Sequence, residues 1–178
     1  MSSAASEPVN EASRPSTGSH TISLFVRDEP GVLVRVALVF SRRGYNIESL
    51  VVSPAAKSGF SRMTMTCSGD PSILEQMIKQ LSKLVDVVHA IDHTHDAAYE
   101  TEIALIKVRC GENDRPGVLQ IAEHFGSKVV DYGTDSVMLR VYGSSEKLDA
   151  MQALLKQFDV AEIVRSGKIL MTRGIETT

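Results

Sequence analysis

The stretch DEPGVLVRVALVFSRRGYNIESL, residues 28–50, decides the fold of this chain. It is predicted to form a loop, a helix and the start of a strand. Pro30 presets φ for a first helical turn and lacks an amide hydrogen that such a turn would leave unpaired, so the helix is predicted to begin there. Arg42 and Arg43 place cations near the carbonyl end of the helix, and Gly44 then ends it.

Residues 32–40 hold eight apolar residues and a single charge, that of Arg35. Periodicity alone does not separate a buried strand from a buried helix in such a run, but the start and stop signals favour a helix. Its apolar surface is too wide to be covered by one sheet. We therefore expect a second apolar surface against this helix, most simply that of a partner chain.

The start of this helix is a candidate site for a free amino acid. Gly31 has no Cβ, so a small ligand can approach backbone N–H groups that have no acceptor within the helix, and such groups attract anions. The N–H groups of Gly31, Val32 and Leu33 therefore suit a carboxylate. Taken alone, Gly31 is equally typical of a plain tight turn.

Three further residues complete the candidate site. The Asp28 carboxylate suits an ammonium group, Asn46 offers both a donor and an acceptor, and Ile47 suits a small branched side chain. Asn46 is also typical of a residue that caps the preceding helix. The sequence contains no nucleophile elbow, phosphate loop or motif of paired carboxylates, so no catalytic residue and no cofactor are predicted in this chain.

A group of metal-ligand side chains between positions 89 and 96 is the rival site. Its members are His89, Asp92, His93, His95 and Asp96, and such side chains bind zinc or nickel in proteins. They straddle a strand end and a linker, so no regular geometry holds them together. A solvated linker is the favoured interpretation, and no metal site is predicted.

The first half of the chain alternates strand and helix patterns in the order β-α-β-β-α-β. Strands are predicted at residues 21–26, 46–53, 60–68 and 85–91. Asp70 and Pro71 predict the start of the second helix. This order packs two helices on one face of a four-stranded antiparallel sheet, which is an α+β fold of the ferredoxin-like type.

The second half repeats this order, which predicts two tandem ferredoxin-like domains. PGVL at residues 116–119 reproduces PGVL at residues 30–33. The strands of the second half are predicted at residues 102–108, 128–132, 137–142 and 160–165, with a helix that carries Leu148, Met151, Leu155 and Phe158. Ser127 and Lys128 stand where the first copy has Tyr45 and Asn46, so the second domain is not expected to bind the same ligand. The predicted divisions are a disordered tail over residues 1–19, a first domain over 20–95 and a second over 96–178.

Composition narrows the possible functions. The net charge is −3 and no basic stripe occurs, which argues against nucleic acid as a partner. No apolar run approaches the length of about 20 residues that spans a bilayer, so no membrane segment is predicted. Cys67 and Cys110 are not in a CxxC pair and are typical of buried residues in a reducing compartment, so a cytoplasmic protein is expected.

The motifs of the first half resemble one known family. PGVL followed by SRRGYNIESL, then SRMTM and KQLSKLVDV, resembles in order the small, regulatory subunit of acetohydroxyacid synthase, also called acetolactate synthase. The N-terminal half of that subunit is an ACT domain. The resemblance covers roughly residues 20–173, which leaves out only the two tails.

The resemblance implies a regulatory function in the biosynthesis of branched-chain amino acids such as valine and isoleucine. Subunits of this family pair their ACT domains side by side as a homodimer and hold valine at the junction, with the loop from one chain and the Asn-bearing segment from its neighbour. By position, the binding residues are Asp28, Gly31, Val32, Leu33, Asn46 and Ile47. The catalytic large subunit carries thiamine diphosphate, magnesium and FAD and condenses pyruvate. This chain is then expected to stimulate that subunit and to confer allosteric feedback inhibition.

One departure from the family leaves the effector open. Many members have Asn where this chain has Asp28, and a carboxylate there favours an ammonium group but repels a carboxylate. The sequence therefore leaves open whether valine, leucine, isoleucine or none of these is the effector. The alternative function is that of a free-standing ACT-domain amino-acid sensor that acts on another partner, although no helix-turn-helix is predicted.

Overall fold

The computed structural model describes residues 18–175 and residue 178, which form two α+β units in tandem. The first unit comprises β1 (Gly18–Arg27), α1 (Val32–Arg42), β2 (Asn46–Pro54), β3 (Phe60–Gly69), α2 (Pro71–Leu81) and β4 (Val87–Asp92). The second comprises β5 (Tyr99–Arg109), α3 (Arg115–His124), β6 (Lys128–Tyr132), β7 (Ser136–Gly143), α4 (Ser145–Leu155), β8 (Asp159–Arg165) and β9 (Ile169–Met171). The predicted fold class, two tandem ferredoxin-like βαββαβ units, is confirmed.

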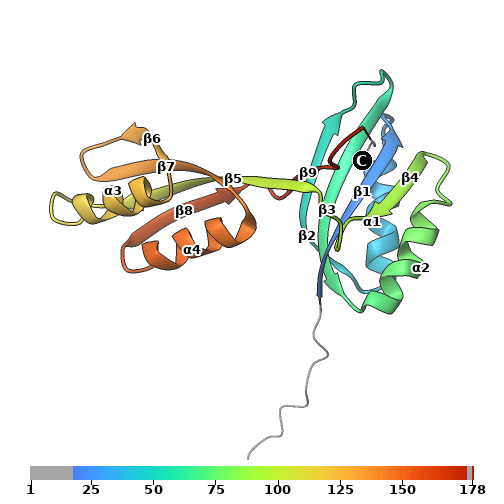
Figure 1. Ribbon diagram of the computed structural model, residues 1–178, viewed down its shortest axis with the longest axis horizontal. Coiled ribbons are helices and arrows are strands. Elements are labelled where there is room, and N and C mark those ends of the chain that lie inside the picture. Colours follow the sequence, from blue (N-terminus) through green and yellow to red (C-terminus); the bar gives the residue numbers. More distant parts are fainter. Residues whose placement is uncertain (1–17, 176–177) are drawn as a thin grey trace, which may run out of the picture.

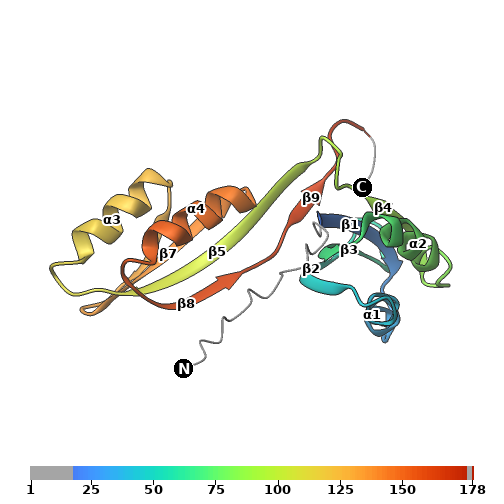
Figure 2. The ribbon, with the colours of Figure 1, turned by 90° about the horizontal axis from the view of Figure 1, so that it is seen from below.

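The first sheet is antiparallel and has the strand order β2-β3-β1-β4. Alternate residues of β1 and β3 point into one apolar core, because successive side chains of a strand point to opposite faces of its sheet. The fully or almost fully buried members on these strands are Ile22, Leu24, Val26, Met63, Met65 and Cys67. Figures 1 and 2 show α1 and α2 covering this face of the sheet, on the side away from the second unit.

Helix α1 begins at Val32, so the predicted start at Pro30 is wrong by two residues. Gly31 is the N-cap and has φ +85°, a left-handed conformation that is incompatible with a helical turn at Pro30 and Gly31. The first helical hydrogen bond runs from the Arg35 N–H to the Gly31 carbonyl oxygen, over 3.1 Å. The predicted end is confirmed, since Gly44 follows the C-cap Arg43 with φ +70°.

Two other boundaries in the first unit differ from the prediction by two residues or more. Gly18 and Ser19, which were assigned to the disordered tail, belong to β1 because they pair with Gly69 and Ser68 of β3. The rest of that predicted tail, residues 1–17, lies outside the described residues. Strand β4 begins two residues later than predicted, since a turn precedes it in which the Val87 N–H donates to the Leu84 carbonyl oxygen over 3.0 Å.

The second sheet has the strand order β6-β7-β5-β8, with α3 and α4 packed on one face. Leu148, Met151 and Leu155 are buried on α4 as predicted, but Phe158 lies beyond the end of this helix. The ring of Phe158 packs against Gly117, where a Cβ would come within 2.9 Å of Cζ. Strand β9 was not predicted; it pairs with residues 99–101 at the start of β5.

The two PGVL copies have different backbone structures. Helix α3 begins at Arg115, one residue before Pro116, so Gly117 lies inside the first helical turn. Gly31 instead precedes α1 in a left-handed conformation. The two halves therefore present different helix starts, which agrees with the expectation that they are not equivalent.

Strand β5 joins the two units. Its first residues pair with β9, and its later residues pair with β7 and β8 of the second sheet. Figure 1 shows this long strand running from the first unit into the second, with β9 beside it at the joint. Residues 93–98 connect β4 to β5. Within the described part of the chain, no helix has the length and apolar character needed to cross a lipid bilayer.

Candidate functional site

Four of the six candidate residues lie at one end of the first sheet. Asp28 follows β1, and its N–H donates to the Gly59 carbonyl oxygen over 2.9 Å. Val32 is 3% exposed and packs into the core, whereas Leu33 is 42% exposed. The loop after β1 and the first turn of α1 therefore bring together Asp28, Gly31, Val32 and Leu33.

The start of α1 offers free amide groups. Within the described residues, the N–H groups of Gly31 and Leu33 have no hydrogen-bond acceptor, and the Val32 N–H has only the Glu29 carbonyl oxygen at 3.4 Å. No side chain of residues 18–175 caps this helix, and no acidic residue lies in its first turn. The positive end of the helix dipole adds to these amides, so this end of α1 suits an anion.

Asn46 and Ile47 lie at the opposite end of the sheet. Asn46 of β2 pairs with Ser68 of β3, and Ser68 also pairs with Ser19 near the start of β1. Asp28, in contrast, directly follows the last residue of β1. The eight residue steps from Ser19 to Arg27 span about 26 Å at the usual rise of a strand. The six candidate residues therefore do not form one pocket within a single chain.

Tyr45 anchors the strand that carries Asn46. Its side chain is 6% exposed, its hydroxyl donates to the Asp70 carbonyl oxygen, and its ring packs against Gly69. Burial, with smaller contributions from Cys67 and Asp70, raises the pKa of this phenol. Asn46 itself is exposed, while Ile47 packs against the core. Sequence reasoning missed this anchor because the tyrosine and the glycine lie far apart in sequence.

Arg35 was also missed as a structural residue. The guanidinium of this first-turn residue bonds the Asp86 carboxylate, with Nη2 at 2.6 Å and Nε at 2.7 Å from Oδ2. The Arg35 Nη1 also lies 3.3 Å from the place where a Cβ at Gly31 would stand. This arginine is therefore held beside the start of α1 and fixes the helix against the turn before β4.

The rival metal-ligand residues do not converge on one point. Among the described residues, no group of three or more histidine, cysteine or acidic side chains is placed to hold a metal ion. His93 is 1% exposed, with Nε2 at 2.7 Å from Ser23 Oγ and Nδ1 at 2.9 Å from Asp96 Oδ2. His89 stacks on Phe25 with ring centroids 5.3 Å apart. These contacts hold residues 93–98 and strand β4 against strand β1.

Both parts of the chain match a known family. Residues 22–89 match the AHAS small subunit-like ACT domain, and residues 101–174 match the small subunit of acetolactate synthase. The acetolactate synthase small subunit of Mycolicibacterium smegmatis is 41% identical over 158 residues, which cover 89% of this chain and 93% of that protein. This chain belongs to the acetolactate synthase small-subunit family.

Other members agree in sequence and in structure. The probable acetolactate synthase small subunit of Methanothermobacter thermautotrophicus is 40% identical over 160 residues, which cover 89% of this chain and 95% of that protein. The crystal structure of the acetolactate synthase small subunit from Thermotoga maritima matches with a TM-score of 0.79 and 35% identity, covering 89% of this chain and 99% of that one. The resemblance read from PGVL and SRRGYNIESL is thereby confirmed, and the chain is a regulatory small subunit.

Proposed function

We propose that this subunit binds the catalytic large subunit of acetolactate synthase, stimulates it, and makes it sensitive to feedback inhibition by valine. Family membership supports the pairing with a large subunit. The observation that carries the effector site is the start of α1, where unpaired amides and a left-handed glycine offer a place for a carboxylate. Thiamine diphosphate, magnesium and FAD belong to the catalytic partner in this proposal, and this chain supplies no cofactor ligand.

A homodimer through the first unit is part of the proposal. Strand β2 is an outer strand of its sheet, and α1 contacts it. Three apolar side chains of α1 remain exposed, Leu33 at 42%, Val34 at 62% and Leu38 at 47%. An open strand edge next to an exposed apolar helix surface is a natural contact for a second copy. The wide apolar run of α1 predicts that a partner chain covers this surface.

A two-fold axis at this edge would assemble the site from two chains. The axis reverses the direction of β2, so the Asn46 end of one strand would lie beside the Pro54 end of the other. Pro54 pairs with Ser61 and Arg27 pairs with Phe60, so Pro54 lies at the same end of the sheet as Asp28. Residues 28–33 of one chain would then meet Asn46 and Ile47 of its partner.

The composite site has the chemistry to hold a small branched amino acid. The carboxylate would accept hydrogen bonds from the Gly31 and Leu33 amides at the positive end of α1. The Asp28 carboxylate would pair with the ammonium group, and Asn46 of the neighbour would supply a donor and an acceptor. Leu33 and Ile47 would contact the side chain. Asp28 orients the ligand, because its charge disfavours the opposite placement of carboxylate and ammonium.

Inhibition would follow from a shift between dimer arrangements. An effector that touches both chains stabilises the arrangement in which the two halves of the site are closest. A docked large subunit that prefers the other arrangement would then lose activity or affinity. A coupling of about 1–3 kcal/mol is usual for such effects and corresponds to a change of about 5- to 150-fold.

The test is reconstitution with a purified catalytic large subunit, followed by an acetolactate assay with and without valine. We expect stimulation without valine and inhibition with it. Asn46→Ala is expected to remove the inhibition and to leave the stimulation largely intact. Asn113→Ala is the control, because Asn113 is an exposed asparagine in the loop before α3 of the second unit, outside the proposed site. An Asn46→Ala variant that responds like the parent would show that the pocket lies elsewhere.

The same experiment separates the alternative function. If the chain binds an amino acid but neither stimulates the large subunit nor changes its response, a free-standing ACT-domain sensor with another partner becomes the better explanation. Leucine and isoleucine are assayed beside valine, since Asp28 leaves the effector open among branched amino acids.

A further inference from the structure

Gly167 makes a close contact between the two units. It lies in the short connection between β8 and β9, is buried, and has φ +82°. A Cβ at this position would come within 2.7 Å of Ser49 Cβ and 2.8 Å of Ser49 Oγ. No real side chain fits at such distances, so only glycine allows the connection to rest on β2 in this way.

The residues on either side of Gly167 both bond the second unit, and Lys168 also reaches the first. Before it, the Arg165 guanidinium bonds Glu102 of β5, with Nε at 2.9 Å and Nη2 at 2.6 Å, and also bonds Asp149 of α4. After it, Lys168 Nζ lies 2.7 Å from Glu100 and 3.4 Å from Thr21 Oγ1 of the first sheet. A displacement of Gly167 therefore affects contacts with both units.

Ser49 belongs to the strand that carries the candidate effector residues. It lies three positions after Asn46, and a register shift separates it from Ile47 in the pairing with β3. Its hydroxyl lies 2.6 Å from Thr66 Oγ1, which holds Ser49 on the face of the sheet opposite the helices. Such a bulge bends the strand and increases its local twist, and this one lies between the candidate effector residues and Ser49.

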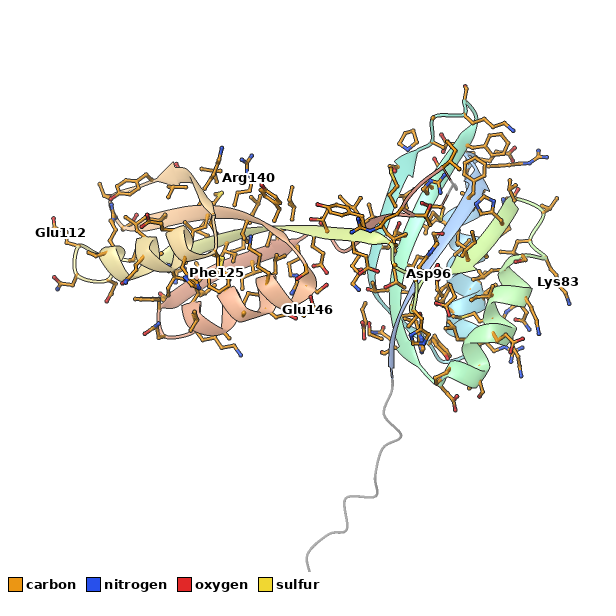
Figure 3. The ribbon with its side chains drawn as sticks, in the orientation of Figure 1. Lys83, Asp96, Glu112, Phe125, Arg140 and Glu146 are labelled. Atoms are coloured by element: carbon orange, nitrogen blue, oxygen red, sulfur yellow. The ribbon has the colours of Figure 1, made fainter. Side chains whose placement is uncertain are left out.

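A cleft beside this contact leaves room for the second unit to tilt. It has a volume of about 420 Å³ and is lined by residues of both units, among them Glu48 and Thr66 on one side and Glu102 and Ser145 on the other. In Figure 3, Glu146 marks the end of α4 that faces the first unit, and Asp96 marks the linker. Gly167 and Lys168 thus contact the first sheet next to an open space.

We propose that Gly167 is the positioning residue that transmits the state of the effector site to the C-terminal unit, through its contact with Ser49. The proposal rests on the proposed effector site at Asn46 and Ile47. Effector binding at the start of β2 shifts Ser49, Ser49 displaces the connection at Gly167, and the ion pairs of Arg165 carry the displacement into β5 and α4. Gly167 itself contacts no effector.

The test compares effector binding with inhibition in the reconstituted complex. Gly167→Ala is expected to bind valine with a dissociation constant close to that of the parent, measured by calorimetry on the full chain. Its inhibition in the acetolactate assay is expected to weaken by about fivefold or more, the lower end of usual allosteric coupling. Gly174→Ala is the matched control, since Gly174 has φ +83° and no atom of the described residues lies within 4 Å of an added Cβ.

Two further variants keep the test decisive. Ser49→Gly combined with Gly167→Ala makes room for the new methyl group and is expected to restore inhibition in part. Ser49→Thr adds a methyl group from the other side of the contact without a change at a left-handed residue, and it is expected to weaken inhibition if Gly167→Ala does not fold. Normal inhibition in Gly167→Ala or in Ser49→Thr, or an equal loss in Gly174→Ala, would overturn the proposal. A parent chain that neither binds valine nor confers inhibition would instead refute the proposed function.

Discussion

Arg35 and Asp86 form an ion pair that holds α1 against the turn before β4, and the two side chains differ in burial. Both Nη2 and Nε of Arg35 lie within 2.7 Å of Asp86 Oδ2. The Asp86 side chain is 7% exposed, whereas that of Arg35 is 44% exposed. Removal of the arginine therefore leaves a buried carboxylate without its partner, while removal of the carboxylate lets the arginine turn to water.

We predict that the two truncations differ in cost. Arg35→Met keeps the apolar stem but is expected to lower the free energy of unfolding by about 2 kcal/mol, and Asp86→Asn by only about 1 kcal/mol. Arg42→Met is the control on the same helix, because Arg42 is exposed and is expected to change stability by less than about 0.5 kcal/mol. Urea unfolding monitored by circular dichroism measures all three. The reverse order of costs would show that the buried carboxylate does not depend on this partner.

Gly31, at the start of α1, is predicted to be needed both for the left-handed backbone conformation and for effector binding. Gly31 and Gly44 have φ +85° and +70°, so alanine at either position costs about 1 kcal/mol of stability. Only at Gly31 does the methyl group also lie beside the free amides of α1. Gly31→Ala is therefore expected to weaken valine binding by about tenfold, or 1.4 kcal/mol, while Gly44→Ala leaves it nearly unchanged. Calorimetric titration of both variants decides this, and equal binding constants would remove Gly31 from the site.

Local patterns were sufficient for most of the fold. The period of two in β3 placed Met63, Met65 and Cys67 in the core, and β6 has the predicted bounds. The errors occur where a contact between residues far apart in sequence, or an unusual backbone conformation, determines where an element begins or whether it forms. The start of α1 depends on the left-handed φ of Gly31, and β9 is a three-residue strand that exists because β5 is beside it.

Local sequence patterns name the six candidate residues but not their relative positions in the sheet. The position of Asn46 opposite Asp28 follows from the pairing of β2 with β3, which no local pattern contains. The contacts of Tyr45 with Gly69 and of Gly167 with Ser49 join residues far apart in sequence. That the six residues bind an effector remains a prediction.

The thiol of Cys67 is predicted to make the protein less stable at alkaline pH. Burial, with smaller contributions from Glu48 and Asp92, raises the pKa of this thiol from the ordinary value of 9.0 to about 12. Between these values the unfolded chain loses the proton while the folded chain keeps it. The contribution of this thiol to stability is therefore complete below about pH 9 and is lost as the pH rises toward 12.

Urea unfolding of the parent and of Cys67→Ala at pH 8 and at pH 10.5 measures this effect. The variant is expected to be less stable at both values because of its cavity, but its stability is expected to fall less between them. Tyr45, whose pKa burial also raises, accounts for part of the slope that remains, so Tyr45→Phe serves as the second comparison. An identical slope in the parent and in Cys67→Ala would show that the thiol does not titrate differently in the two states.

The separation of Asp28 from Asn46 across the sheet gives the strongest prediction for the dimer. If each site takes its loop from one chain and its asparagine from the other, two different defective chains complement one another. Gly31→Asp puts a carboxylate at the anion end of the site in a residue type that tolerates a left-handed φ, and Asn46→Ala removes the opposite half. In a mixed dimer of these variants, one site carries both changes and the other carries neither.

Each variant alone is therefore expected to lose valine binding, and the mixed dimer to regain half of the sites with the affinity of the parent. The mixture is prepared by unfolding and refolding the two chains together, with two affinity tags to isolate the mixed species, and the number of sites is measured by calorimetry. Chains refolded separately and then combined are the control, since they contain only defective dimers until they exchange. A mixed dimer that binds no valine, although the parent refolded in the same way does, would mean that each site lies within one chain, and the two-fold arrangement proposed for β2 and α1 would be wrong.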